Sequence, residues 1–156
     1  MGYNVIDLID KAIDLAVRRK LIYKNIGKQK CDIPSIKVMS KVLIKQTDKT
    51  IEHYEDIKRE LGNATSEEID FHVYDKISFL INEFNRNIHT SEIHNVRELL
   101  KFSLDLERDT YSLLIDIQGR LIKNESDMYT KTYEILSDSI NNKAKHIKTL
   151  EEILNK

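Results

Sequence analysis

Glu107 is a carboxylate in the middle of a stripe of aliphatic residues. It lies seven residues after Leu100 and seven residues before Leu114. Because seven residues make about two turns of an α-helix, the three side chains share one helix face. A lone carboxylate on a buried face costs several kcal/mol. Two arrangements offset that cost: coordination of a metal ion, or an ion pair with a cationic side chain.

Lys143 and His146 interrupt a second aliphatic stripe in the same way. Lys143 lies seven residues from both Leu136 and Leu150, and His146 follows it by three residues. Imidazole is a common metal ligand, whereas an ammonium group repels a metal cation and attracts a carboxylate. We therefore predict a buried ion pair between Glu107 and Lys143.

A weak internal repeat relates the two halves of the chain. The segment AIDLAVRRKLIY (12–23) aligns with SLDLERDTYSLL (103–114), and LIKQTDKTIEHYEDI (43–57) aligns with SINNKAKHIKTLEEI (139–153). The repeat predicts two similar helical hairpins joined by a long connecting segment.

The alignment extends the polar positions to the first half of the chain. Small or polar residues stand at about mid-length of each of the four long apolar stripes: Ala16, Thr47, Thr50, Glu107, Lys143 and His146. We expect these six residues to face each other in one central polar layer. In that layer Thr47, Thr50 and His146 are expected to donate hydrogen bonds to the ion pair.

Apolar residues at helical spacing predict five amphipathic helices. The first runs from about Val5 to Gly27. The second has Asp32 as its expected cap and Pro34 in its first turn, and Gly62 closes it.

The remaining three helices follow a polar stretch. Thr65-Ser66-Glu67-Glu68 has the pattern of a capping box and predicts a helix over residues 66–88. A fourth helix is expected over about 96–122, and a fifth, capped by Ser126, continues to Leu154. No segment alternates with a period of two residues, so no sheet is predicted.

The lengths of these helices predict how they pack. Four of them are about 25–30 residues long, or ~40 Å, and helices of that length bury their stripes best at shallow crossing angles. We predict one all-α domain over residues 1–156. It is expected to be a four-helix bundle of two hairpins, joined by a long crossover that contains the fifth helix.

This arrangement resembles the ferritin-like four-helix bundles, and most closely the rubrerythrin-type proteins. The segment FLINEFNRNIHTSEIHNVRELLKFSLDLERDTYSLL (79–114) is similar to the corresponding part of that family. In such proteins a Glu on helices one and three joins a Glu-x-x-His pair on helices two and four, and the six residues hold two iron ions.

Residue by residue, the resemblance implies that this ligand set is largely lost. Glu107 stands for the helix-three carboxylate and His146 for the last histidine, while the other four positions carry residues that do not ligate iron: Ala16, Thr47, Thr50 and Lys143. Two ligands cannot hold a two-iron centre, so we expect no cofactor. The alternative is a reduced site for iron or another divalent metal at Glu107 and His146.

The charge and composition exclude several function classes. The chain has 25 Lys and Arg against 26 Asp and Glu, a formal net charge of −1, which gives no electrostatic case for nucleic acid. The densest basic run, Arg18–Lys20, is expected to be a solvated helix face. No apolar run approaches the ~20 residues that span a bilayer, so no membrane partner is expected. The single Cys31 suits a reducing cytoplasm.

Three functions remain open. The favoured one is a ferritin-like protein without a di-iron centre that acts as a non-catalytic binding or structural protein. The second is a metal-binding or oxidative-stress protein that uses Glu107 and His146. The third is a small-molecule binder that uses the vacated central cavity. A homodimer through helix faces is expected, with Phe71, Tyr74 and Phe79 as its candidate contact.

Overall fold

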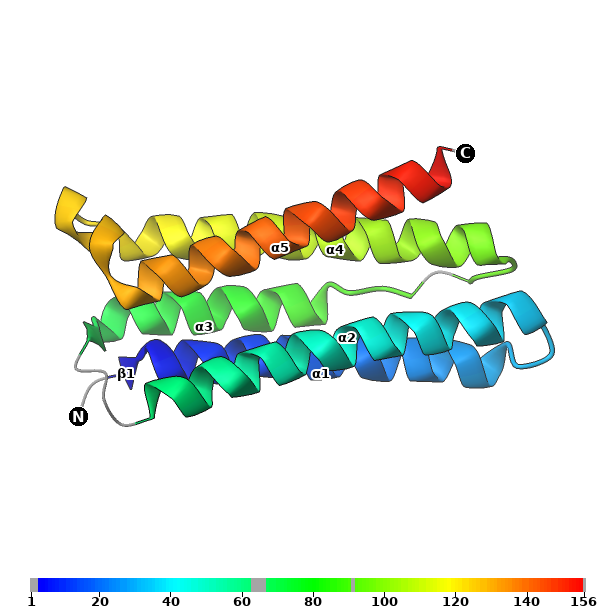
Figure 1. Ribbon diagram of the computed structural model, residues 1–156, viewed down its shortest axis with the longest axis horizontal. Helices are drawn as coiled ribbons and strands as arrows, with labels where there is room; N and C mark the ends of the chain where they lie inside the picture. The colour runs from blue at the N-terminus through cyan, green and yellow to red at the C-terminus, as the bar shows by residue number, and fades with distance from the viewer. Residues whose placement is uncertain (1–2, 63–66, 91, 156) are drawn as a thin grey trace. The chain divides into compact units, whose positions relative to one another are not determined.

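The computed structural model describes residues 3–62, 67–90 and 92–155. Within these ranges the chain forms five α-helices, one short 3-10 helix and one pair of two-residue strands (Figure 1). The predicted all-α class is confirmed. The chain divides into two compact units, which are described separately. Among the described residues, unit 1 contains 3–5, 67–88 and 100–155, and unit 2 contains 6–62, 89–90 and 92–99.

Unit 2 is built on a helical hairpin. Helix α1 (Val5–Gln29) and helix α2 (Pro34–Leu61) run antiparallel, from blue to green in Figure 1. Two ion pairs of 2.7 Å each join these helices, Lys20–Asp48 and Lys58–Asp10. The first predicted hairpin is therefore present.

The ends of α2 follow the predicted signals in part. Pro34 is the first helical residue, where its missing N–H is not needed. The cap is Ile33 and makes no side-chain hydrogen bond, so the prediction of Asp32 as the cap is wrong. Gly62 ends the helix with a φ of 51°, and its N–H donates to the Lys58 carbonyl.

Unit 1 contains the second hairpin and the crossover helix. Helix α4 (Val96–Leu121), which enters unit 1 at Leu100, runs antiparallel to α5 (Lys131–Leu154) (Figure 1). The turn between them holds the 3-10 helix η1 (Glu125–Tyr129). The crossover helix α3 (Phe71–Arg86) runs alongside this hairpin.

The start of α3 differs from the prediction. The helix begins at Phe71, and the Asp70 carboxylate caps it by accepting hydrogen bonds from the N–H groups of His72 and Val73. Glu68 lies in a strand and not in a first helical turn, so the predicted start near residue 66 is wrong. Thr65 and Ser66 of the expected capping box lie outside the described residues.

A short strand pair precedes α3 in unit 1. Strand β1 (Tyr3–Asn4) pairs antiparallel with β2 (Glu68–Ile69). Tyr3 also stacks on Tyr74, with ring centroids 3.7 Å apart. The prediction of no sheet is therefore wrong at these four residues.

The start of α5 also differs from the prediction. Thr130 caps the helix, and its hydroxyl accepts a hydrogen bond of 3.1 Å from the Tyr133 N–H. Ser126 lies within η1, and its hydroxyl donates to Asn124. Ser126 is therefore not the cap of the last helix.

Aliphatic side chains fill both units. The buried residues of unit 1 include Ile69, Ile77, Ile81, Leu100, Leu104, Leu106, Leu113, Leu114, Ile117, Ile135, Leu136, Ile140, Leu150 and Leu154. Those of unit 2 include Leu8, Ile9, Ala16, Tyr23, Ile26, Ile36, Leu43, Tyr54, Ile93 and Leu99. Ile153, near the end of α5, is 43% exposed. Within the described ranges, no helix has the length and apolar character needed to cross a membrane.

Candidate functional site

A buried ion pair joins α4 and α5 within unit 1. Lys143 Nζ donates a hydrogen bond of 2.9 Å to Glu107 Oε2, and the two side chains are 6% and 7% exposed. The predicted pair is confirmed. Because water is nearly excluded, the two opposite charges attract each other more strongly than a surface pair does.

The spacing of residues along α4 and α5 explains why both members of this pair are buried. On α4, Glu107 shares its stripe with Leu100 and Leu114, which are both buried. On α5, Lys143 lies between Leu136 and Leu150, which are also buried. The antiparallel hairpin brings the middles of the two helices together, so the two charged side chains meet at the same level.

Buried serine and threonine residues lie near the ion pair on α4 and α5. Ser103 and Thr110 on α4 and Ser139 on α5 are buried, each within one helical turn of Glu107 or Lys143. The Thr110 hydroxyl donates to the Leu106 carbonyl at 2.8 Å, and the Ser139 hydroxyl donates to the Ile135 carbonyl at 3.1 Å. These two hydroxyls are satisfied by their own helices.

The donors at this pair do not suit a di-iron centre. The Lys143 ammonium contacts the Glu107 carboxylate at 2.9 Å, and it would repel a metal cation placed beside that carboxylate. Within residues 3–62, 67–90 and 92–155, no group of three or more His, Cys, Asp or Glu side chains is arranged to hold a metal ion.

The other predicted layer residues are placed separately in the two units. His146 is half-buried on α5, one turn after Lys143. Ala16 is buried on α1, Thr47 is buried on α2, and Thr50 is half-buried on α2. That all six residues form one layer stays a prediction.

Thr47 and Thr50 use their hydroxyl protons within α2. The Thr47 hydroxyl donates to the Leu43 carbonyl at 2.8 Å, and the Thr50 hydroxyl donates to the Gln46 carbonyl at 3.3 Å. Each hydroxyl has one proton, so the expectation that these residues donate to the ion pair is wrong.

Arg19 is a buried cation that the sequence analysis missed. It is 7% exposed on α1, although the run Arg18–Lys20 was expected to be a solvated face. Its spacing supplies the missing signal, because Arg19 lies three residues after Ala16 and four before Tyr23, both of which are buried.

A pocket of about 200 Å³ lies in unit 1 beside the start of α3 and the turn between α4 and α5. The sequence gives no sign of this pocket, because its wall comes from segments far apart in the chain. The wall is lined by Glu67, Glu68, Ile69, Asp70, Val73, Gln118, Leu121, Ile122, Lys123, Asp127, Thr130, Thr132 and Tyr133. None of the six predicted layer residues lines it.

The carboxylates of this pocket hold backbone N–H groups at the ends of helices. Glu67 accepts hydrogen bonds from the N–H groups of Lys131 and Thr132 at 2.8 and 3.1 Å, and from the Thr132 hydroxyl at 2.9 Å. Burial alone would raise the pKa of Glu67, but these hydrogen bonds outweigh burial and hold the pKa below its ordinary value. Glu67 therefore ties the β2 segment to the first turn of α5.

Asp127 fixes the turn after α4 in a similar way. Its carboxylate accepts hydrogen bonds from the N–H groups of Lys123 and Asn124 at 2.7 and 3.1 Å. The first of these bonds, followed by the second, lowers the pKa of the Asp127 carboxyl. The pKa of Asp70 is lowered likewise, first by the Val73 N–H. These acids act as caps, which is a structural role.

Comparison with known proteins gave no match to a family model, a curated protein or a solved structure.

Proposed function

We propose that this chain is a ferritin-like helical bundle that has lost its di-iron centre and acts as a non-catalytic binding or structural protein. One observation carries the proposal: the Lys143 ammonium lies 2.9 Å from Glu107, both side chains being buried. The ion pair supplies, from within the chain, a positive charge of the kind that iron supplies to the carboxylates of the related bundles.

The remaining ligand set supports the same conclusion. A two-iron centre needs several carboxylates to neutralise the metal charge in an apolar core. Of the six implied positions only Glu107 and His146 keep a ligating side chain. An ammonium beside Glu107 adds repulsion to the loss of ligands, so a metal must displace an existing ion pair before it can bind there.

A ferrous-ion titration of the purified protein tests this proposal. We expect no stoichiometric binding by the wild type. Lys143→Glu restores a Glu-x-x-His pair and is expected to gain binding, whereas Lys145→Glu makes the same charge change at an exposed neighbouring position and is expected to gain none. Stoichiometric binding by the wild type, or consumption of peroxide that depends on Glu107, would support the metal-handling alternative instead.

We also propose a homodimer that uses α3. Phe71 and Phe79 are 61% and 51% exposed on this helix, and exposed aromatic side chains on a helix favour association. Tyr74, which was expected in the same contact, is half-buried and stacked on Tyr3. The proposed contact is therefore reduced to the two phenylalanines.

A further inference from the structure

The net charge of −1 conceals a strongly uneven distribution. Residues 15–47 contain nine Lys and Arg and a single acid, Asp32, which gives this segment a formal charge of +8. The rest of the chain contains 16 basic and 25 acidic residues, a formal charge of −9. The net charge of the chain therefore does not exclude an anionic partner for this segment, named here the basic hairpin.

The basic hairpin lies wholly in unit 2. It comprises the second half of α1, the connection 30–33 and the first half of α2. Lys30 is half-buried. Five other lysines of the hairpin are exposed: Lys24, Lys28, Lys37, Lys41 and Lys45. In the described part of the chain none of these six lysines makes an ion pair with an acidic side chain.

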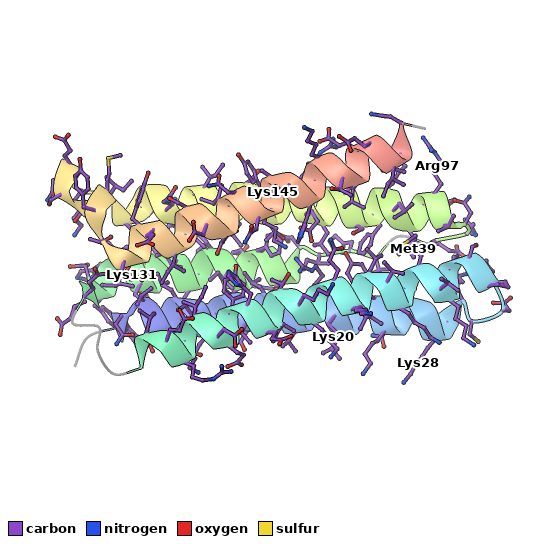
Figure 2. The ribbon with its side chains drawn as sticks, viewed as in Figure 1. Lys20, Lys28, Met39, Arg97, Lys131 and Lys145 are labelled. Carbon is purple, nitrogen blue, oxygen red and sulfur yellow. The ribbon has the colours of Figure 1, made fainter. Side chains whose placement is uncertain are left out.

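The lysines recur at helical spacing on the outer faces of both helices. On α2, Lys37, Lys41 and Lys45 follow each other at steps of four residues and are all exposed, so they form one row along the helix. On α1, Lys24 and Lys28 are four residues apart and both exposed, and Lys28 projects away from the ribbon (Figure 2). The result is a row of positive charge on each helix of unit 2.

Aliphatic side chains are exposed among these lysines. Val38 and Val42 on α2 are 61% and 52% exposed, and Val17 and Leu21 on α1 are 40% and 53% exposed. Val38 lies two residues after the buried Ile36, and Val42 lies two residues after the buried Ser40. Two residues correspond to a rotation of about 200° around the helix axis. These side chains therefore point away from the packed face and toward the same side as the lysines.

This combination distinguishes between anionic partners. Nucleic acids are bound through phosphate contacts together with polar, arginine or aromatic contacts to bases, and a row of valines and leucine offers none of these. Lysine is a point charge that attracts phosphate without bidentate geometry. Clustered lysines with aliphatic side chains suit a lipid surface, where anionic headgroups lie above an apolar layer.

A second copy of the chain fits the basic hairpin less well. The densest acidic segment elsewhere, residues 52–75, contains eight acids and two basic residues. Three of these acids, Asp56, Glu67 and Asp70, already accept hydrogen bonds within the chain, and acidic side chains offer no apolar contact to the exposed valines of the basic hairpin.

We infer that the basic hairpin binds the surface of membranes that contain anionic lipids. The lysines attract the headgroups, and Val17, Leu21, Val38 and Val42 enter the boundary of the acyl region. This association is peripheral. It rests on unit 2 and does not depend on the Glu107–Lys143 pair, so it stands or falls separately from the proposed loss of the metal centre.

Co-sedimentation with vesicles tests the inference on the whole chain. We expect binding to phosphatidylcholine vesicles with about one-third phosphatidylserine at ~0.1 M salt, and at least tenfold weaker binding at ~0.5 M salt, where charges are screened. Vesicles of phosphatidylcholine alone are expected to bind at least tenfold more weakly. Absence of binding to the anionic vesicles, or equal binding to both kinds, overturns the inference.

Matched variants separate the cluster from the total charge. Lys37→Gln/Lys41→Gln/Lys45→Gln is expected to weaken binding by about 100-fold, since each lysine near an anionic surface contributes roughly a factor of five. The control Lys101→Gln/Lys145→Gln/Lys148→Gln removes the same charge from exposed positions of α4 and α5, and is expected to change binding by less than about threefold. Equal losses in the two variants contradict a specific surface.

Two further measurements distinguish the other anionic partners. Val38→Ser/Val42→Ser is expected to weaken vesicle binding several-fold and to leave any binding to a duplex oligonucleotide unchanged. Tighter binding of the wild type to the duplex than to anionic vesicles would assign the basic hairpin to nucleic acid. Self-association in light scattering that the α2 lysine variant abolishes would assign it to a second copy. Either result overturns the inference.

Discussion

The charges of two residues, Glu107 and Lys143, determine the chemistry at the centre of unit 1. A buried carboxylate requires a positive partner, and on α5 that partner is the Lys143 ammonium at 2.9 Å. Such a pair costs the desolvation of two charges, so replacing both partners by apolar residues is often neutral, whereas removing one partner leaves an uncompensated charge. The pair therefore specifies how α4 and α5 align more than it adds to stability.

Removing one partner of this pair should be costly. We expect Lys143→Met to lower the free energy of unfolding by about 3–5 kcal/mol, and Glu107→Leu/Lys143→Met to recover most of that loss. Urea denaturation measures both, with the exposed neighbour Lys145→Met as the control. A cost below about 1 kcal/mol for Lys143→Met would show that Glu107 is not held by the ammonium.

Glu67 should give the protein an acid-sensitive stability. Its pKa in the folded state lies below the ordinary value of 4.5. Its contribution is therefore fully present above pH 4.5 and is lost as the pH falls through the lower, folded-state pKa. We expect Glu67→Gln to reduce stability by about 1 kcal/mol at pH 7 and to flatten the pH dependence below pH 4.5.

The neighbouring Glu68 provides the control for this prediction. It lines the same pocket and is exposed, and no hydrogen bond to its side chain is present among the described residues. Urea unfolding between pH 7 and pH 3 should therefore be the same for Glu68→Gln and the wild type. An unchanged pH profile in Glu67→Gln would mean that the cap does not depend on its charge.

For the helices and strands, the sequence predicts which helix face is buried better than it predicts the residue at which a helix begins. The stripe through Leu100, Glu107 and Leu114 recurs over many turns, so its phase is well determined and the buried pair could be predicted. Helix starts depend on single residues that compete as caps: Thr130 caps α5 although Ser126 is of an equally suitable type. Arg19 was missed because it belongs to a charged run, and only its spacing shows that it is buried.

Contacts between distant segments leave no local pattern. Strand β2 has only two residues, and so has its distant partner, Tyr3–Asn4. Neither segment alternates for long enough to indicate a strand. The pocket was missed for the same reason, since residues of β2 and of the α4–α5 turn meet there only in the fold.

Gly62 at the end of α2 and Gly119 inside α4 should respond in opposite ways to alanine substitution. Gly62 has a φ of 51°, and a side chain there costs about 1–2 kcal/mol. We therefore expect Gly62→Ala to lower the melting temperature. Gly119 in α4 has nothing within 4 Å of an added Cβ, so Gly119→Ala should raise it through up to ~1 kcal/mol of helix propensity. Equal shifts in thermal melting would contradict this assignment.

For the whole molecule, the net charge does not show how the charged residues are distributed along the chain. A formal net charge of −1 gives no electrostatic case for nucleic acid, yet positive charge is concentrated in residues 15–47 and negative charge in segments such as 52–75. The six predicted layer residues illustrate a second limit. Their positions along the helices follow from periodicity, but a common layer requires the packing of α1 and α2 on α4 and α5, which stays a prediction.

Self-association is a property of the whole molecule that α3 should control. We expect a dimer in light scattering at micromolar concentration, and we expect Phe71→Ser/Phe79→Ser to weaken it by at least tenfold, because exposed aromatic anchors dominate such contacts. The exposed Val38→Ser/Val42→Ser change on α2 should leave the dimer intact. A monomer at all concentrations, or a dimer indifferent to the phenylalanines, would exclude α3 as the contact.

The metal content of the purified protein, measured together with anomalous X-ray scattering from its crystals, shows whether a metal ion or the Lys143 ammonium neutralises Glu107. After growth with abundant iron, manganese and zinc, we expect well below one bound metal ion per chain, with Lys143 Nζ in hydrogen-bond contact with Glu107. A stoichiometric ion beside Glu107, with the ammonium displaced into solvent, would contradict this expectation.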